Sequence, residues 1–553
     1  MNEGYYVTNH QWKSYVRRRT FLKTISSAFL LATASLKQAM AFSRPKVSFR
    51  HGVASGDPTG SSVIIWTRVS SAFSDNLDVR WQIANDAAMQ DIVTQGHIET
   101  GAFRDFTVKV DVTGLAPGRN YCYRFICNGQ ESVVGSTRTL PQNTPRMARF
   151  AVVSCSSYPT GFFNAYRDIA ERDDLDLVLH LGDYIYEYGL GQYGTQNATA
   201  LGRVPEPAEE ILSLADYRSR HAQYKTDVDL QAMHAKLPML AIWDDHEFAN
   251  DAWKNGAENH SPDEGGWAER RDGALQAYFE WMPVRGEPEG PNTRIFRDFR
   301  FGGLASILLL DTRLFGRDRQ PNVGGDVTVE SITKALQDPA RRLLGADQEA
   351  WLRERLQGSV DTTWQVIAQQ VMVARMEPPN LEPLVDREKP SLFNADQLDR
   401  AIQNSQYHSP QILDVWDGYP VAKEDFLSDL GNFAKNPVVL SGDLHTALAA
   451  NLVPSSGGAP VAVELMTTSV TSPGLSAYFP DRIPDGIRDA TLAQNPNFHF
   501  LDIEQHGWLC VTLTAEECVG EWHMVDTISS RDYASSIAKR LSVQAGGVAK
   551  GLA

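Results

Sequence analysis

Cysteine is scarce in this sequence, with only five residues among 553. An odd count leaves at least one thiol unpaired in an oxidising compartment, so disulfides cannot account for all five. Cys510 and Cys518 flank a turn-sized segment, but the sequence leaves open whether they, or Cys122 and Cys127, are paired. Cys155 follows a short apolar run, and we expect a chemical role for it; the alternative is a buried apolar cysteine.

Long apolar runs are also missing. The stretch from Ile25 to Leu36 is too short for a good transmembrane span, and no other stretch is long enough. It lies between Arg18-Arg19-Thr20-Phe21-Leu22-Lys23 and Ala39-Met40-Ala41, an order typical of a cleavable signal peptide. The Arg-Arg-x-Phe-Leu-Lys form resembles a twin-arginine export signal. We therefore expect residues 1–41 to be a signal peptide and the protein to be periplasmic or secreted; the alternative is a short amphipathic helix on a cytosolic protein.

Positive charge is deficient. The chain has 52 basic and 68 acidic residues, and removal of residues 1–41 leaves 46 and 67, a net charge of −21. Such a surface repels nucleic acid and anionic lipid headgroups at long range, so no nucleic-acid partner is expected. A phosphate ester is not excluded as substrate, because metal ions can make a pocket positive.

Residues 46–141 read as a small β-domain. Short predicted strands are separated by turn-rich segments and comprise Val63–Thr67, Val79–Gln82 and Phe106–Val110. The run from Leu115 to Tyr121 resembles the late hairpin of a fibronectin type III-like sandwich. The domain either positions or covers a site, or it only adds stability.

Residues 147–525 alternate predicted strands with helices, and most of the strands stop at a polar or ligand-type residue. The predicted strands are Ala148–Val153, Leu175–Leu181, Leu237–Trp243, Leu304–Leu310, Trp364–Ala368 and Val438–Leu440. This order predicts an α/β domain of two packed sheets flanked by helices, with one crevice at the strand ends. Residues 526–553 are predicted to form a helical tail.

The side chains that follow these strands form a mixed ligand set. They are Cys155, Asp183, Tyr186, Asp245, His246, Asp443 and His445. A phenolate and a thiolate beside carboxylates suit a ferric ion, and the oxygen-rich positions suit Ca²⁺, Mg²⁺ or Mn²⁺. Asp183 has two oxygens and is the natural bridge between two ions. Two cations can hold the attacking and leaving oxygens of a displacement at phosphorus.

Three motifs carry a family resemblance: Gly182-Asp183-x-x-Tyr186, Asp245-His246-Glu247 and Gly442-Asp443-x-His445. They resemble the blocks of calcineurin-like metallophosphoesterases, with the Asp-x-x-Tyr spacing of purple acid phosphatases. The fuller strings around them, with Ser154-Cys155-Ser156, resemble the PhoD-type alkaline phosphatases more closely. The resemblance implies a four-layer metallophosphoesterase sandwich with an amino-terminal fibronectin type III-like β-sandwich, and a tail that covers the crevice as a lid.

The resemblance also implies one ferric ion and one or two calcium ions, although other divalent metals are compatible. Cys155, Asp183, Tyr186 and His445 would hold iron, and Asp183, Asp245 and Asp443 would hold calcium. Asp245 and Asp443 stand where metallophosphoesterases generally have Asn and His. Both changes supply an anionic oxygen, which favours calcium over zinc.

Two further residues are candidates for catalysis. His246 either protonates the leaving alkoxide or hydrogen-bonds a metal ligand. Arg313 either clamps phosphate or forms a surface salt bridge. Weaker crevice candidates are Asn250, Gln369, Gln370 and His506.

The sequence therefore predicts an exported, metal-dependent phosphatase in which a metal-bound hydroxide attacks phosphate monoesters and diesters in line. An alternative enzyme is a phospholipase D-like or cell-wall polymer phosphodiesterase. An alternative of another class is a non-catalytic exported metal- or phosphate-binding protein. The expected partners are a small phosphate ester and the twin-arginine translocation machinery, and the expected state is a monomer.

Overall fold

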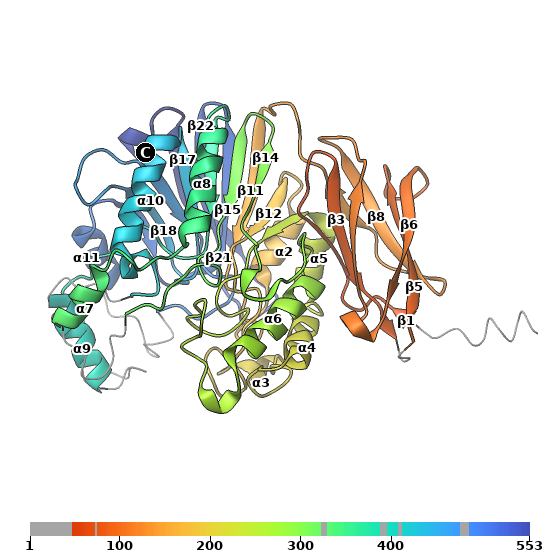
Figure 1. Ribbon diagram of the computed structural model, residues 1–553, viewed down its shortest axis with the longest axis horizontal. Helices are drawn as coiled ribbons and strands as arrows, with labels where there is room; N and C mark the ends of the chain where they lie inside the picture. The colour runs from red at the N-terminus through yellow and green to blue at the C-terminus, as the bar shows by residue number, and fades with distance from the viewer. Residues whose placement is uncertain (1–46, 72–74, 322–328, 387–394, 407–411, 476–485) are drawn as a thin grey trace, which may run out of the picture.

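The computed structural model describes residues 47–71, 75–321, 329–386, 395–406, 412–475 and 486–553 (Figure 1). The predicted signal peptide, residues 1–41, lies outside this part of the chain. Among the described residues, no helix combines the length and apolar character that crossing a membrane requires.

Two large mixed sheets form the centre of the molecule. The first has nine strands in the order β23-β22-β21-β11-β12-β13-β2-β3-β7. Their bounds are Ser535–Gln544, Glu517–Val525, His506–Thr514, Met147–Val153, Leu177–His180, Met239–Ala241, Val53–Gly56, Ser62–Arg68 and Thr107–Thr113. The second has seven strands in the order β14-β15-β16-β17-β19-β18-β20. Their bounds are Arg297–Phe301, Ala305–Leu309, Trp364–Ala368, Pro437–Ser441, Ala462–Met466, Ala447–Leu452 and Phe498–Asp502.

Parallel strands lie in the middle of both sheets. Strands β11, β12 and β13 are parallel in the first sheet, and β15, β16, β17 and β19 are parallel in the second. One hydrophobic core joins the facing sides of the sheets and includes Val152 and Leu179 of the first with Val366 and Leu440 of the second. Because both faces of these strands are covered, their sequences are continuous apolar runs.

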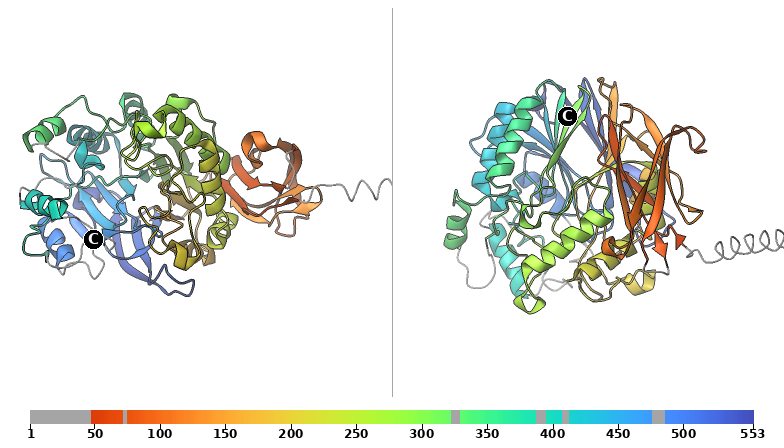
Figure 2. Two further views of the ribbon diagram at one scale, coloured as in Figure 1. Left: turned by 90° about the horizontal axis from the view of Figure 1, so that it is seen from below. Right: turned by 45° about the vertical axis from the view of Figure 1, so that its right-hand side comes forward.

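Helices cover the outer faces of the two sheets (Figures 1 and 2). Helices α2 (Asn164–Glu171) and α5 (Val228–Lys236) pack against the nine-stranded sheet. Helices α8 (Ala346–Gly358) and α10 (Pro420–Phe433) share a second core with the seven-stranded sheet. The remaining helices are α3 (Ala198–Leu201), α4 (Leu214–Tyr224), α6 (Trp267–Trp281), α7 (Val329–Leu336), α9 (Ala395–Gln406) and α11 (Ile487–Gln494). Short 3₁₀ turns span Ala102–Arg104, Pro262–Glu264, Gly290–Asn292, Trp416–Gly418 and Val548–Lys550.

The stretch from Leu214 to His234 is two helices, α4 and α5. Helix α4 begins at a capping box in which Ser213 and Asp216 bond each other's backbone amides. Asp227 begins α5 by accepting hydrogen bonds from the Asp229 and Leu230 amides at 2.9 and 3.2 Å. This second cap explains why the helix restarts there.

The amino-terminal part is a β-domain, as predicted, but it is not separate from the rest. Strands β2, β3 and β7 extend the nine-stranded sheet, because Gly56 of β2 pairs with Met239 of β13. These three strands share a core with a smaller, five-stranded sheet of order β10-β8-β5-β6, in which β9 also pairs with β8. The bounds of that sheet are Gly135–Arg138, Asn120–Cys127, Leu77–Ala84, Ile92–Thr100 and Gln130–Glu131. A two-stranded sheet pairs β1 (Val47–Ser48) with β4 (Ser70–Ser71).

The prediction of a helical tail is wrong. Residues Ser535–Gln544 form strand β23, which pairs with β22 along the edge of the nine-stranded sheet. Leu541 and Val543 are buried and alternate with more exposed residues, which is the period of a strand. Backbone pairing with the otherwise open edge of β22 outweighs the helical pattern of the sequence.

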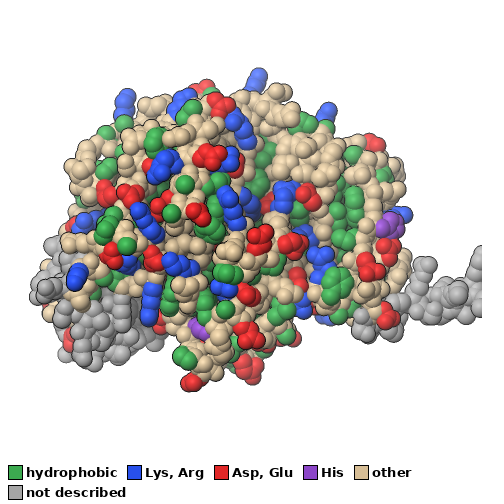
Figure 3. Space-filling model, viewed as in Figure 1, with side chains coloured by type: hydrophobic (Ala, Val, Ile, Leu, Met, Phe, Trp, Pro, Cys, Tyr) green, Lys and Arg blue, Asp and Glu red, His purple; other side chains and the backbone are tan. Residues whose placement is uncertain are grey.

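All five cysteines are free. Cys510 lies opposite Glu521 in the β21–β22 ladder, whereas Cys518 lies opposite Leu513. The two thiols therefore do not pair across the hairpin. On the face shown in Figure 3, acidic and basic side chains are interspersed over the described surface, so opposite charges neutralise each other locally.

Candidate metal centre

The loops after four parallel strands converge on one cleft, which has a volume of about 540 Å³. Cys155 follows β11, Asp183 follows β12, Asp245 and His246 follow β13, and Asp443 and His445 follow β17. All of these except Cys155 line the cleft. Because the carboxyl ends of parallel strands lie at one edge of a sheet, segments far apart in sequence deliver their side chains to one place.

A sulfur-containing cluster lies at one side of the cleft. Ligand atoms of Cys155, Asp183 and His445 all lie within 4.8 Å of one another. The Tyr186 hydroxyl donates to Asp183 Oδ2 at 2.9 Å and lies 3.2 Å from His445 Nε2. The four residues predicted to hold iron are thus neighbours. Thiolate, phenolate, carboxylate and imidazole groups in contact are a donor set that fits a ferric ion.

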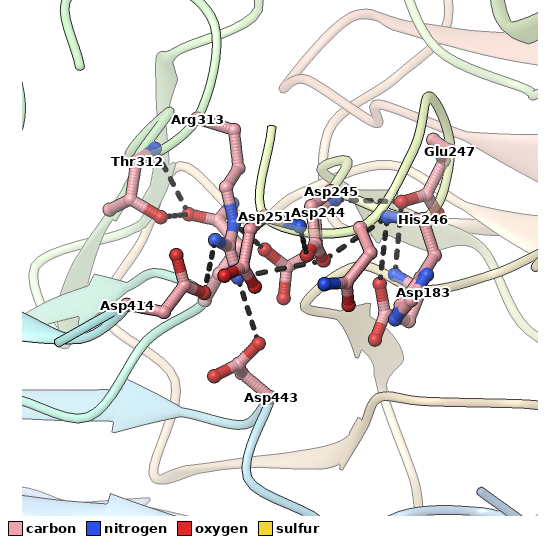
Figure 4. Close-up of polar contacts among 12 residues, drawn as sticks. Asp183, Asp244, Asp245, His246, Glu247, Asp251, Thr312, Arg313, Asp414 and Asp443 are labelled. Atoms are coloured by element: carbon pink, nitrogen blue, oxygen red, sulfur yellow. Dashed lines mark hydrogen bonds and ion pairs between the residues drawn. The ribbon is translucent and has the colours of Figure 1, made fainter. Parts of the chain in front are cut away.

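Carboxylates gather beside this cluster (Figure 4). Three more sets of ligand atoms lie within 4.8 Å of one another. They are Asp183, Asp245 and His246; Asp244, Asp245 and Asp443; and Asp245, Asp251 and Asp414. Asp245 is common to all three, and Asp183 connects the first to the sulfur-containing cluster. Such oxygen-rich surroundings fit Ca²⁺ or another hard cation.

The ligand loops have an unusual backbone conformation. Cys155, Asp183, Asp443 and His445 have φ angles of 61°, 56°, 66° and 54°. Non-glycine residues seldom adopt this left-handed region, and strain of this kind concentrates at functional sites. Gly182, at φ 109°, has no alternative, because a Cβ atom there would lie 2.4 Å from the Asp244 Cβ.

The buried carboxylates favour cations electrostatically. Burial, together with neighbouring carboxylates, raises the pKa of Asp183 and Asp443 well above the usual value. Burial and the Asp414 charge raise the pKa of Asp251 to about 8, and burial raises that of Asp244 to about 6. Like charges brought this close need protons or cations between them. The donor set therefore fits bound metal ions.

Arg313 lies behind the cleft and does not line it. Its side chain is fully buried, and its guanidinium group forms ion pairs with Asp244, Asp414 at 2.5 Å, Asp443 at 2.8 Å and Asp245 at 3.5 Å (Figure 4). This location differs from both predicted roles. A phosphate clamp would line the cleft, and a surface salt bridge would be exposed. In this arrangement Arg313 is a buried counter-ion for the acidic cluster.

His246 is held in a defined orientation. Its Nδ1 lies 2.7 Å from Oε2 of Glu187, which is fully buried. The other Glu187 oxygen accepts from the Asn250 amide at 2.7 Å and the Asn259 side chain at 2.9 Å. The imidazole ring stacks on Tyr186 with centroids 4.2 Å apart. Since Nδ1 is engaged, Nε2 is the nitrogen left for a substrate.

The charges around His246 favour its protonated form. Burial alone would lower its pKa, but the Glu187, Asp245 and Asp183 carboxylates raise the pKa well above the usual value. Burial works against ionisation of Glu187, yet His246 holds the pKa of Glu187 below its usual value. The contact between the two groups therefore favours an imidazolium paired with a carboxylate.

The weaker candidates separate into two groups. Asn250 lines the cleft, whereas Gln369, Gln370 and His506 do not. Gln370 ties two strand-end loops together, because it accepts from the Thr312 amide at 3.1 Å and donates to the Leu310 carbonyl at 2.9 Å.

The sequence interpretation missed Glu187, Tyr193, Asp251 and Asp414. Tyr193 lies 3.1 Å from His445 Nδ1 and donates to the Pro473 carbonyl at 2.8 Å. Asp251 and Asp414 follow no strand, so the strand-end rule could not find them. Glu187 could have been found from its position directly after Tyr186 in the motif.

Part of the cleft wall is apolar. The side chains there include Met372, Met376, Leu444, Leu448, Met466 and Leu501. No residue from 526 to 553 is among the described residues that line the cleft. The prediction that the tail covers the cleft as a lid is therefore wrong, as is the prediction that it is a helix.

Comparisons with known proteins agree over nearly the whole chain. The PhoD-like phosphatase model matches residues 150–522, and the model of the PhoD-like phosphatase N-terminal domain matches residues 34–141. The chain is 35% identical over 505 residues to alkaline phosphatase D of Bacillus subtilis (strain 168), covering 87% of this chain and 78% of that protein. A solved structure of PhoD matches with a TM-score of 0.77 and 32% identity over 91% of each chain. The chain is therefore a phosphoesterase hydrolase and belongs to the PhoD-like phosphatase family.

Proposed function

We propose that this protein is an exported, metal-dependent phosphatase that hydrolyses phosphate monoesters and diesters. The observation that carries the proposal is the contact between the sulfur-containing cluster and the carboxylate sets, which share Asp183. We also propose the finer architecture, a four-layer metallophosphoesterase sandwich with a fibronectin type III-like domain, export of the chain through the twin-arginine machinery, and a monomeric state.

In this proposal a ferric ion binds to Cys155, Asp183, Tyr186 and His445. One or two calcium ions bind to the carboxylate sets that include Asp183, Asp245 and Asp443. Bound cations of this kind would supply Lewis acidity at the phosphoryl oxygens and a nucleophile at neutral pH.

The protein's own groups position the ester and manage its protons. His246, protonated and held through Nδ1 by Glu187, donates a proton from Nε2 to the leaving alkoxide. Arg313 keeps Asp244, Asp245 and Asp443 in place from behind the cleft. The apolar wall excludes water from one side of the site.

A colorimetric assay with an aryl monoester and a bis-aryl diester tests the proposal. Each substrate is measured with the protein as purified, after chelation, and after re-addition of Ca²⁺. Turnover should disappear with chelator and return with Ca²⁺, and a visible tyrosinate-to-iron absorption band should accompany the active protein. Undiminished turnover in the metal-free protein would overturn it.

The apolar wall favours a second candidate, a phospholipase D-like diesterase that takes esters with large apolar groups. Comparing kcat/KM for long-chain and short-chain dialkyl phosphates tests this function. The substitution Met376→Gln keeps the side-chain length but makes the wall polar, and it should reduce the preference for the long chain while sparing monoester turnover. Equal rates for both chain lengths would contradict this candidate. A non-catalytic binding role is not favoured, because the chain belongs to a phosphatase family.

A further inference from the structure

A second group of metal-ligating side chains lies on the nine-stranded sheet, outside the cleft. Cys510 belongs to β21, and Glu521 and His523 belong to β22. The Cys510 sulfur, a Glu521 carboxylate oxygen and a His523 ring nitrogen all lie within 4.8 Å of one another. None of the three lines the catalytic cleft.

The register of the two strands explains why these side chains meet. Cys510 is directly opposite Glu521, and Trp508 is directly opposite His523. Residues two apart on a strand share a face, so the two cross-strand pairs form one patch. Two neighbouring antiparallel strands thus hold a thiol, a carboxylate and an imidazole together without any loop.

His523 supplies an independent sign that a ligand is missing from its surroundings. The residue is only 7% exposed, and its Nε2 has no hydrogen-bond partner among the described residues. Leaving such a buried nitrogen unsatisfied is energetically unfavourable. The ring cannot easily turn away, because it stacks on Trp508 with centroids 4.3 Å apart, and Trp508 donates to Asp168 at 2.7 Å.

Two arginines near the group share one carboxylate, Asp174. Arg172 donates two hydrogen bonds to Asp174 at 2.9 and 2.8 Å, and Arg149 pairs with the same carboxylate. Glu521 has a distant ion pair with Arg540, at 3.4 Å, and its side chain is 21% exposed. Its carboxylate can therefore turn towards Cys510 and His523 at little cost.

We propose that Cys510, Glu521 and His523 bind a zinc-type divalent transition-metal ion at a site separate from the catalytic centre. One thiolate, one carboxylate and one imidazole form a borderline-soft set that suits Zn²⁺ and does not suit Ca²⁺ or Mg²⁺. Metal–ligand bonds of about 2.0–2.3 Å place tetrahedral ligand atoms ~3.5 Å from one another. Side-chain rotations that move the ligand atoms by about 1 Å therefore complete the site. Water takes the fourth position, and the ion joins β21 to β22.

The test counts bound zinc in the full-length holoenzyme. Zinc is titrated against a chromophoric chelator, and the wild type is compared with Cys510→Ser, His523→Gln and Glu521→Gln. Each of the first two variants should bind one equivalent less than the wild type, and the third should bind the same ion more weakly. Cys122→Ser is the control, because Cys122 is a free thiol that lies outside this group; it is partly exposed, whereas Cys510 is buried, and the variant should retain the full count.

Cobalt distinguishes this site from the catalytic one, which also contains a cysteine. A thiolate-to-cobalt charge-transfer band should lose intensity in Cys510→Ser but not in Cys122→Ser, while phosphatase turnover stays unchanged in both. Thermal unfolding in zinc-free buffer checks that Cys510→Ser and Glu521→Gln are folded. An unchanged zinc count in Cys510→Ser and His523→Gln, or an equal loss in Cys122→Ser, would overturn the proposal.

Discussion

The pairing of His246 with Glu187 leads to a quantitative prediction for the variant Glu187→Gln. The substitution keeps the shape of the side chain but removes the charge that lies 2.7 Å from His246 Nδ1 in a buried setting. A hydrogen bond to a charged group contributes about 1.5–3 kcal/mol. If His246 loses this stabilisation as a proton donor, turnover should fall about 10- to 150-fold, because about 1.4 kcal/mol corresponds to a factor of ten.

The effect should depend on the leaving group. An alkyl alcohol is a poor leaving group and needs the proton, whereas a nitrophenolate leaves without it. Turnover of an alkyl phosphate should therefore fall by the full factor and that of an aryl phosphate by much less. Because Glu187 raises the pKa of His246, and the acid form exists below that pKa, the alkaline limb of the pH–rate profile should move to lower pH.

Glu210→Gln is the matched control for this experiment. Glu210 is a glutamate of the same region that contacts Asn259 at 3.2 Å and Arg270 at 2.8 Å, and it connects to His246 only through Asn259 and Glu187. It should leave both the leaving-group dependence and the pH profile unchanged. Equal losses on alkyl and aryl esters in Glu187→Gln, with an unmoved alkaline limb, would refute a proton-donating His246.

Four further outcomes follow from the same contacts. Arg313→Met should lower the free energy of unfolding by about 3–5 kcal/mol, as loss of one partner of a buried ion pair does. Denaturant unfolding should show a smaller loss with Ca²⁺ than with chelator. If Arg313→Met instead raises KM without changing stability, Arg313 is a phosphate clamp. Asp183→Asn should lose metal, measured by elemental analysis, and turnover together, and retention of either would contradict a bridging role. Tyr186→Phe should lose the visible absorption band while keeping calcium, and a persisting band would exclude Tyr186 as its source. Deleting residues 526–553 should expose the edge of β22 and lower the thermal midpoint, with the ratio of diester to monoester turnover unchanged; an altered ratio would restore the lid.

The sequence predicted which side chains converge on the cleft because one physical rule places them. Asp183, Asp245 and Asp443 each come soon after a short apolar run, the first two at the strand ends of the nine-stranded sheet and the third at a strand end of the seven-stranded sheet packed against it. Asp251 and Asp414 have no such marker, since packing between loops alone puts them beside Asp245. Nothing in a single sequence reports that kind of proximity.

The tail and Arg313 were mispredicted for a related reason. Ser535–Gln544 has a strand-like alternation only at its end, at Leu541 and Val543, and the partner that decides its structure is the edge of β22. Arg313 follows a strand end, like the true cleft residues, but four carboxylates from other segments surround it. In both cases the deciding contact is with a distant part of the chain.

The acidity of the cleft bears on the proposed metal dependence. Asp183, Asp245, Asp251, Asp414 and Asp443 line the same cleft that must receive an anionic ester. Arg313, behind the cleft, already pairs with Asp244, Asp245, Asp414 and Asp443, and His246 already contacts Glu187. Without cations these carboxylates are relieved only by protons, so the cleft offers phosphate little positive charge and should bind it poorly. Metal removal should abolish binding of the product phosphate, measured by calorimetry, as completely as it abolishes turnover, and phosphate binding by the metal-free protein would show that some other group supplies the positive charge.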